Sequence, residues 1–146
     1  MKQEDKDLLL TYLSMALPYG VKLKKYNEDN SAVELYSINL EHEAIQYWSY
    51  KSGSLQIGGY GHLIRRDKLQ FKPYLRPLSS MTEEEEKEFN NQMYKAKPYS
   101  DGKSYNVYEV IGLNIIYLNS HHFDYLGLIP KGLAIAITEE NNPYKK

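Results

Sequence analysis

The sequence predicts an α+β fold with an N-terminal helix, an antiparallel β-meander and two or more C-terminal helices packed on one face. Three observations support this class. The first residues have the apolar spacing of a helix, the following segments alternate as half-buried strands do, and helical patterns return after residue 82. Because the strands are grouped and do not alternate with helices, we expect an antiparallel sheet.

Length and composition suit one domain. The chain has 146 residues, of which 42% are hydrophobic and 25% charged, close to globular averages. It has no cysteine, which excludes disulfides, thiolate metal sites and cysteine nucleophiles. The start lacks a secretory pattern, and no window approaches the ~20 apolar residues of a membrane span. We therefore expect a cytoplasmic protein with a single domain over residues 1–138 and a flexible tail over 139–146.

The N-terminal half is predicted to contain one helix and several strands. Leucines recur at helical spacing over residues 4–16, with acids in the first turn, and Pro18 and Gly20 end the helix. A hairpin turn is predicted at residues 51–54. Strand patterns occur in four short segments, at residues 21–24, 33–40, 45–50 and 55–57.

Two helices are predicted in the C-terminal half. Thr82 and Glu85 have the spacing of a capping box at the start of a helix over residues 83–94. Residues 107–118 are mostly apolar, and their length favours a helix, although their β-branched residues leave a strand possible. Positions i, i+4 and i+7 of this segment predict one buried stripe, made of Ile111, Ile115 and Leu118.

Charged residues are unevenly distributed along the chain, and tyrosine is far more frequent than the other aromatic residues. The net charge is −1, but residues 27–45 carry five acids and no Lys or Arg, whereas residues 51–76 carry six bases and one acid. There are 15 tyrosines against 3 Phe and 1 Trp. Tyrosine is favoured at half-buried sheet positions and also at protein interfaces. We expect sheet positions for most of them, with a binding surface as the alternative.

The basic and aromatic stretch at residues 62–76 is the main candidate binding surface. Pro73 and Pro77 lack backbone donors, which predicts a loop or an edge strand that is open to solvent. Arginine with aromatic residues suits phosphate contact and base stacking, and it suits protein interfaces equally. The structural alternative is a charged loop that pairs with the acidic segment 27–45 or with the predicted helix over residues 83–94, which begins with a run of glutamates. The candidate binding residues are Arg65, Arg66, Lys72, Tyr74 and Arg76.

A possible polar cluster consists of His121, His122 and Asp124. On a helix, His121 and Asp124 would share a face, whereas His122 would point about 100° away. A metal site usually needs three or four protein ligands, and the spacing supplies no others. The favoured alternative is a helix end, with the histidines near the last carbonyls and Asp124 capping the next turn. We therefore predict no catalytic residue, metal or cofactor.

Three segments together resemble a known group of proteins. They are Leu-Pro-Tyr-Gly-Val at 17–21, the segment 72–85 that begins Lys-Pro-Tyr-Leu-Arg-Pro-Leu, and the segment 119–134 that begins Asn-Ser-His-His-Phe-Asp-Tyr. They are similar to small uncharacterised proteins encoded by phages, prophages and mobile elements of gut Bacteroidales. Many of those relatives have Arg at the position of Leu126 and Glu at that of Pro130. The resemblance implies expression in the cytoplasm of a bacterial host, and it implies no activity.

These observations leave three functional hypotheses. The favoured one is a non-catalytic accessory protein that binds a protein partner, because no complete catalytic motif occurs. The first alternative is a nucleic-acid-binding protein that uses residues 62–76. The second is a small enzyme that uses His121 and Asp124. None of the three requires attachment to a membrane.

Overall fold

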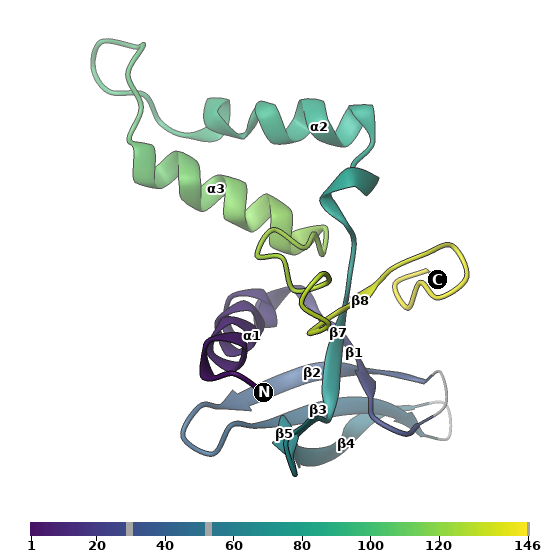
Figure 1. Ribbon diagram of the computed structural model, residues 1–146. Coiled ribbons are helices and arrows are strands. Elements are labelled where there is room, and N and C mark those ends of the chain that lie inside the picture. The colour runs from purple at the N-terminus through teal and green to yellow at the C-terminus, as the bar shows by residue number, and fades with distance from the viewer. Residues whose placement is uncertain (29–30, 52–53, 146) are drawn as a thin grey trace.

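The computed structural model describes residues 1–28, 31–51 and 54–145, with the side chains of 49–58 left out, and it confirms the α+β class (Figure 1). Helix α1 (Gln3–Ala16) covers one face of the sheet. Helices α2 (Glu83–Asn90) and α3 (Val107–Ser120) run in opposite directions on the same side of the sheet, beyond α1. No helix in these described ranges has the length and apolar content needed to cross a membrane.

Six strands form the main sheet of the described chain, in the order β4 (Ser54–His62), β3 (Ala44–Lys51), β2 (Ala32–Asn39), β1 (Lys22–Lys25), β7 (Phe71–Leu75) and β8 (Ile135–Ala136). The first four strands form the predicted antiparallel meander, and β7 joins it by pairing antiparallel with β1. The predicted turn at 51–54 includes residues 52 and 53, which lie outside the described residues. The strands β5 (Ile64–Arg65) and β6 (Lys68–Leu69) pair with each other in a separate hairpin.

Helix α1 supplies the centre of the core. Its fully buried residues recur at i, i+3, i+4 and i+7, which places them on one face of the helix, toward the sheet. The helix ends in a 3₁₀ turn, η1 (Leu17–Tyr19), and Gly20 then adopts a φ of 69°, which glycine accepts without strain. The buried face is made of Leu9, Tyr12, Leu13 and Ala16.

Tyr12→Phe is expected to raise the free energy of unfolding by about 1 kcal/mol, because a buried polar group without a partner costs stability. The Tyr12 hydroxyl is buried and has no hydrogen-bond partner among the described residues, and burial raises its pKa. Urea unfolding measures the change. Tyr125→Phe is the matched control, because the Tyr125 hydroxyl donates to Asn119 Oδ1 at 3.1 Å and its loss should be destabilising. A Tyr12→Phe protein less stable than wild type would contradict the prediction.

Strand β7 lies inside the sheet, so the prediction of an edge or loop around Pro73 is wrong. The register explains how a proline fits there. Tyr26 N donates to Gln70 O, and by the alternation of the antiparallel ladder the nitrogen of Pro73 points away from β1. On the other side, β8 begins only opposite Tyr74. The missing donor of Pro73 therefore breaks no ladder hydrogen bond.

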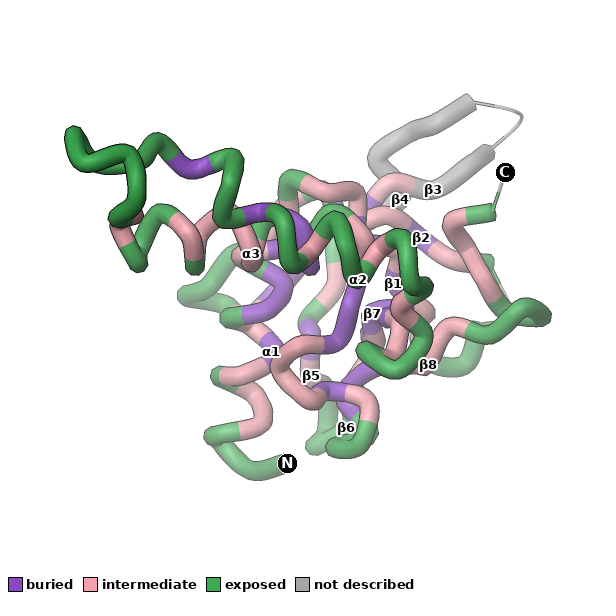
Figure 2. The backbone as a smooth tube through the Cα atoms, turned by 90° about the horizontal axis from the view of Figure 1, so that it is seen from above, coloured by how far each residue is buried: buried purple, intermediate pink, exposed green. Residues whose placement is uncertain are grey.

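Helices α2 and α3 form a helical lobe, defined as residues 82–120, which includes the 3₁₀ helix η3 (Gln92–Lys95). The predicted helix over 83–94 is thus divided into α2 and η3. Tyr117 on α3 faces α2, since its hydroxyl donates to Glu85 O at 3.1 Å and its ring lies 5.9 Å from that of Phe89. Figure 2 shows that the outer end of this lobe is largely exposed.

The prediction of a buried stripe on α3 is wrong. The helix itself is confirmed, but Ile111 is 47% exposed and Ile115 is half-buried, so that only Leu118 of the three is buried. The reason is the direction in which α2 lies. Ile111 is about 120° around the helix from Tyr117, which faces α2. The apolar side of the first turns of α3 is therefore left open to solvent.

Thr82→Ala should lower the free energy of unfolding by about 0.5–2 kcal/mol, the usual effect of losing an N-cap. The capping box is confirmed: Glu85 N donates to Thr82 Oγ1, and Thr82 N donates to Glu85 Oε1, both at 3.2 Å. The shift in the denaturation midpoint measures the effect. Thr82→Ser keeps the acceptor and should restore most of the stability, and an unchanged midpoint in the alanine variant would refute this role.

The C-terminal segment is anchored at Tyr144. The Tyr144 hydroxyl accepts from Lys22 N at 2.9 Å and donates to Tyr74 O at 3.3 Å. Its ring stacks on that of His122, with the centroids 3.8 Å apart. The expected flexible tail over 139–146 therefore contains one residue that binds the strands.

Candidate functional site: a basic groove on the sheet

The five predicted binding residues do not form one surface. Arg65 and Arg66 are exposed in the β5–β6 hairpin, and Lys72 is half-buried on β7. Tyr74 is only 5% exposed, because β8 and Tyr144 lie beside this part of β7. Arg76 is partly buried and is bound to α2. Three of the five are therefore available to a ligand.

Arg76 has a structural role. Its Nη1 and Nη2 donate to the two carboxylate oxygens of Glu85 at 2.6 and 2.8 Å, and its guanidinium lies 4.3 Å from the centroid of the Phe123 ring. The hydrogen bond from Arg76 is the main reason that the pKa of Glu85 is lowered to about 2. For Arg76, the structural alternative is correct, because this side chain pairs with a glutamate of helix α2.

The register of β1 and β7 builds the groove. Lys24 and Lys72 are direct partners in the antiparallel pairing, so their side chains share one face of the sheet. Tyr26 and Gln70 lie two residues further on, just outside β1 and β7, where Tyr26 N donates to Gln70 O and the alternation continues on that same face. Leu23 points to the opposite face and is fully buried in the core. One side of the sheet thus packs against α1, and the other carries these polar side chains.

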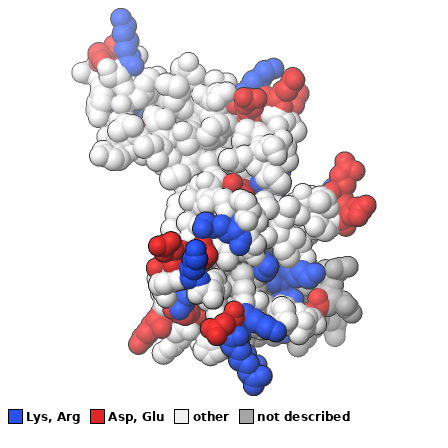
Figure 3. Space-filling view, viewed as in Figure 1, with Lys and Arg blue, Asp and Glu red and all other residues white. Residues whose placement is uncertain are grey.

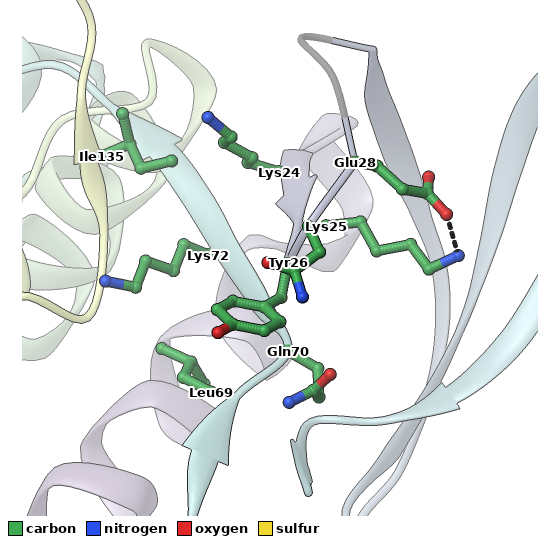
Figure 4. Close-up of a pocket in the computed structure, with 9 residues that line it drawn as sticks. Lys24, Lys25, Tyr26, Glu28, Leu69, Gln70, Lys72 and Ile135 are labelled. Atoms are coloured by element: carbon green, nitrogen blue, oxygen red, sulfur yellow. Dashed lines mark hydrogen bonds and ion pairs between the residues drawn. The ribbon is translucent and has the colours of Figure 1, made fainter.

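The groove has a volume of about 510 Å³. Figure 4 shows the Lys24 and Lys72 side chains extending toward Ile135, with the Tyr26 ring beneath them and Leu69 below. Glu28 lies at the other end, where it is paired with Lys25, and this contact raises the pKa of Lys25. Apolar side chains and lysine stems therefore line the groove, and two ammonium groups lie at one end of it.

Two neighbouring hollows extend the basic groove. One, of about 360 Å³, is lined by Tyr26, Arg65, Arg66 and Lys68, and Lys68 Nζ lies 5.8 Å from the centroid of the Tyr26 ring. The other, of about 420 Å³, contains Tyr60 and His62. Gln70 lines all three hollows, so they adjoin one another.

Most cations of the basic groove have no acidic partner. Within residues 1–28, 31–51 and 54–145, no ion pair involves Lys24, Arg65, Arg66, Lys68 or Lys72. Glu34 and Glu43 of the acidic segment are paired with Lys22 and Lys6 instead. Among the described residues, Asp67 in the hairpin and Glu28 at the rim are carboxylates near the groove. The five unpaired cations are Lys24, Arg65, Arg66, Lys68 and Lys72.

Sequence reasoning missed Lys24 and Tyr26, because they lie on a strand far from residues 62–76 in the chain. The alternation of Val21, Lys22, Leu23 and Lys24 does place Lys24 on the polar face of a strand. Nothing local indicates which strand lies next to β1. The pairing with β7 supplies that information.

His121 and Asp124 lie at the end of a helix and at the start of the next turn, as the alternative to a polar site predicts. His121 Nδ1 lies 2.9 Å from the carbonyl oxygen of Tyr117, one turn before the end of α3. The buried Asp124 carboxylate accepts from Leu128 N at 2.7 Å and from Ile129 N at 2.8 Å. It therefore caps the following turn. In the described part of the chain, no group of three His, Cys, Asp or Glu side chains could hold a metal ion.

His122 has an unusual environment. Its backbone φ is 59°, its Nδ1 is buried, and no described residue offers that atom a hydrogen bond. Burial lowers the pKa of His122 to about 4, helped by the charges of His121, Arg76 and Lys22, while Glu34 acts in the opposite direction. The histidine is therefore neutral near pH 7.

Comparison with known proteins adds no family to this description. A scan against protein-family models gives no match, and searches of curated proteins and of solved structures give none either. The resemblance to phage and prophage proteins stays a prediction.

Proposed function

We propose that the protein binds single-stranded nucleic acid in the basic groove. The observation that carries the proposal is that five cations, which form no ion pair within the described residues, line the hollows around the exposed Tyr26 ring, and that one of them, Arg65, also lines the hollow of the exposed Tyr60 ring. Cations that follow a phosphate backbone and aromatic rings on which bases stack are the two components of single-strand recognition. An acidic protein is the competing partner, because tyrosine is also enriched at protein interfaces.

The overall charge of −1 does not oppose this proposal, because the charge is divided between regions. Exposed glutamates are concentrated on α2, in the helical lobe, and three glutamates near the sheet, Glu28, Glu34 and Glu43, are paired with lysines. Phosphates in the groove therefore meet a locally positive surface. With at most five phosphate contacts, we expect binding that weakens with salt, with a log–log slope of about −2 to −3.5.

Fluorescence anisotropy with labelled oligothymidylate and oligouridylate, measured over a series of salt concentrations, tests this function. Lys24→Ala/Lys72→Ala should reduce the affinity and make the salt slope shallower by about 1–2. Tyr26→Ala should weaken binding by about 1–3 kcal/mol, the usual effect of losing one stacking ring. Arg65→Ala/Arg66→Ala should weaken binding while leaving folding nearly intact, because both side chains are exposed.

The matched control is Lys95→Ala/Lys103→Ala, which removes the same charge from exposed positions in the helical lobe. This control should bind like wild type. Equal losses in the control and groove variants would show attraction by net charge alone. Unchanged binding in Tyr26→Ala would remove the stacking component and with it the preference for nucleic acid.

A further inference from the structure

The helical lobe has an apolar surface that is separate from the basic groove. Val107 and Ile111 on α3 are 60% and 47% exposed, and they lie one turn apart on one side of the helix. Leu118 lies about 20° around the helix from Ile111, so it continues the same side. Figure 3 shows the middle of this lobe as uncharged, with charged side chains at its two ends.

The apolar side of α3 leads into a hollow of about 480 Å³. Leu118 forms one wall, and Phe89 on α2 forms another. Leu78 of the short 3₁₀ helix η2 (Leu78–Ser80) and the adjacent Met81 also line it. A volume of this size can take apolar side chains from a partner.

The rim of the hollow is acidic. Glu86 lines it directly, and Glu83 lies one turn earlier on the same side of α2. Glu83, Glu84 and Glu86 are exposed, and none of them forms an ion pair within the described residues. Lys87 is the only basic residue of α2, so the carboxylates dominate this rim.

We propose that the helical lobe binds an amphipathic, basic α-helix of a partner protein. Apolar residues of that helix at i, i+3 or i+4 and i+7 would contact the Val107–Ile111–Leu118 side of α3 and enter the hollow. Lys or Arg on its flank would face Glu83 and Glu86. A second copy of this chain is the less suitable occupant, because a two-fold interface brings two copies of the same acidic surface together.

The test uses three synthetic peptides and isothermal titration calorimetry with the full chain. The first peptide has leucines at helical spacing and lysines on the flank, the second has glutamates in place of the lysines, and the third is a scrambled form of the first. The lysine peptide should bind at least tenfold more tightly than either of the others. Ile111→Ser and Glu83→Gln/Glu86→Gln should each reduce its affinity at least fivefold.

Two variants serve as controls. Ile116→Ser removes an isoleucine that is 51% exposed and lies about 140° around α3 from Ile111, and it should bind the lysine peptide like wild type. Lys24→Ala/Lys72→Ala should also bind like wild type, which separates this surface from the basic groove. Circular dichroism shows that each variant is folded.

Four results would overturn the proposal. The first is that the lysine peptide does not bind, and the second is that the glutamate or scrambled peptide binds equally well. The third is that Ile116→Ser and Ile111→Ser lose the same affinity for the lysine peptide. The fourth is that the wild type is a dimer in sedimentation velocity and Ile111→Ser converts it to a monomer. The last result would make this surface an interface between copies of the chain.

Discussion

Phe123→Ala is expected to lower the free energy of unfolding by about 3–5 kcal/mol, the range for truncating a fully enclosed aromatic side chain. Phe123 is completely buried, and it packs with Tyr117 and Leu118 at the end of α3. Its ring also supports the Arg76 guanidinium at 4.3 Å. The substitution therefore removes core contacts and leaves a cavity between the sheet and the helical lobe.

Backbone hydrogen bonds show why the effect should reach both regions. Asp124 N donates to Arg76 O and Arg76 N donates to His122 O, both at 2.8 Å, so the segment around Phe123 is attached to the end of β7. Urea unfolding followed by circular dichroism measures the loss. Phe89→Ala is the control in the same cluster, and it should cost less because Phe89 is only half-buried. A cost below about 1 kcal/mol for Phe123→Ala would mean that the two regions do not depend on this contact.

His122→Asn is expected to remove an acid-dependent loss of stability. The pKa of His122 is about 4 in the folded protein, below the value of about 6.5 in an unfolded chain. A histidine with a lowered folded pKa stabilises the protein above the unfolded pKa, and this contribution is lost as the pH falls through the folded pKa. Wild type should therefore lose about 2–3 kcal/mol between pH 7 and pH 4 from this group.

Asparagine is the appropriate replacement, because it tolerates the left-handed backbone at φ 59° and does not titrate. Urea unfolding of both proteins at several pH values gives the difference in stability, which should move in favour of His122→Asn toward pH 4. His42→Asn, at an exposed position, controls for the loss of one histidine. Parallel stability curves for wild type and His122→Asn would show that burial does not disfavour the charged imidazole.

Features set by neighbouring residues in the chain could be predicted. The capping box at Thr82 and Glu85 needs only four consecutive residues, and the buried face of α1 needs only the helical repeat. The antiparallel meander follows from strands that succeed one another with short connections. The cap formed by Asp124 is also local, because its two donors lie four and five residues ahead.

The candidate site could be predicted only in part. Exposure of Arg65 and Arg66 follows from their place in a short charged hairpin. Tyr74 and Arg76 share the alternation of Lys72, so their sequence pattern alone could not separate them from it. Their burial depends on β8, Tyr144 and Glu85, which come from distant parts of the chain.

Local patterns predict the buried face of α1, the strands of the meander and the capping box, because helix repeat, strand alternation and capping depend on residues only a few positions apart. Which surfaces form depends on the tertiary arrangement. Pairing of β1 with β7 placed Lys24 opposite Lys72 and made a groove, and the position of α2 left Ile111 exposed although its spacing suits a core. Both outcomes depend on which segments become neighbours in space, and packing between distant segments determines this.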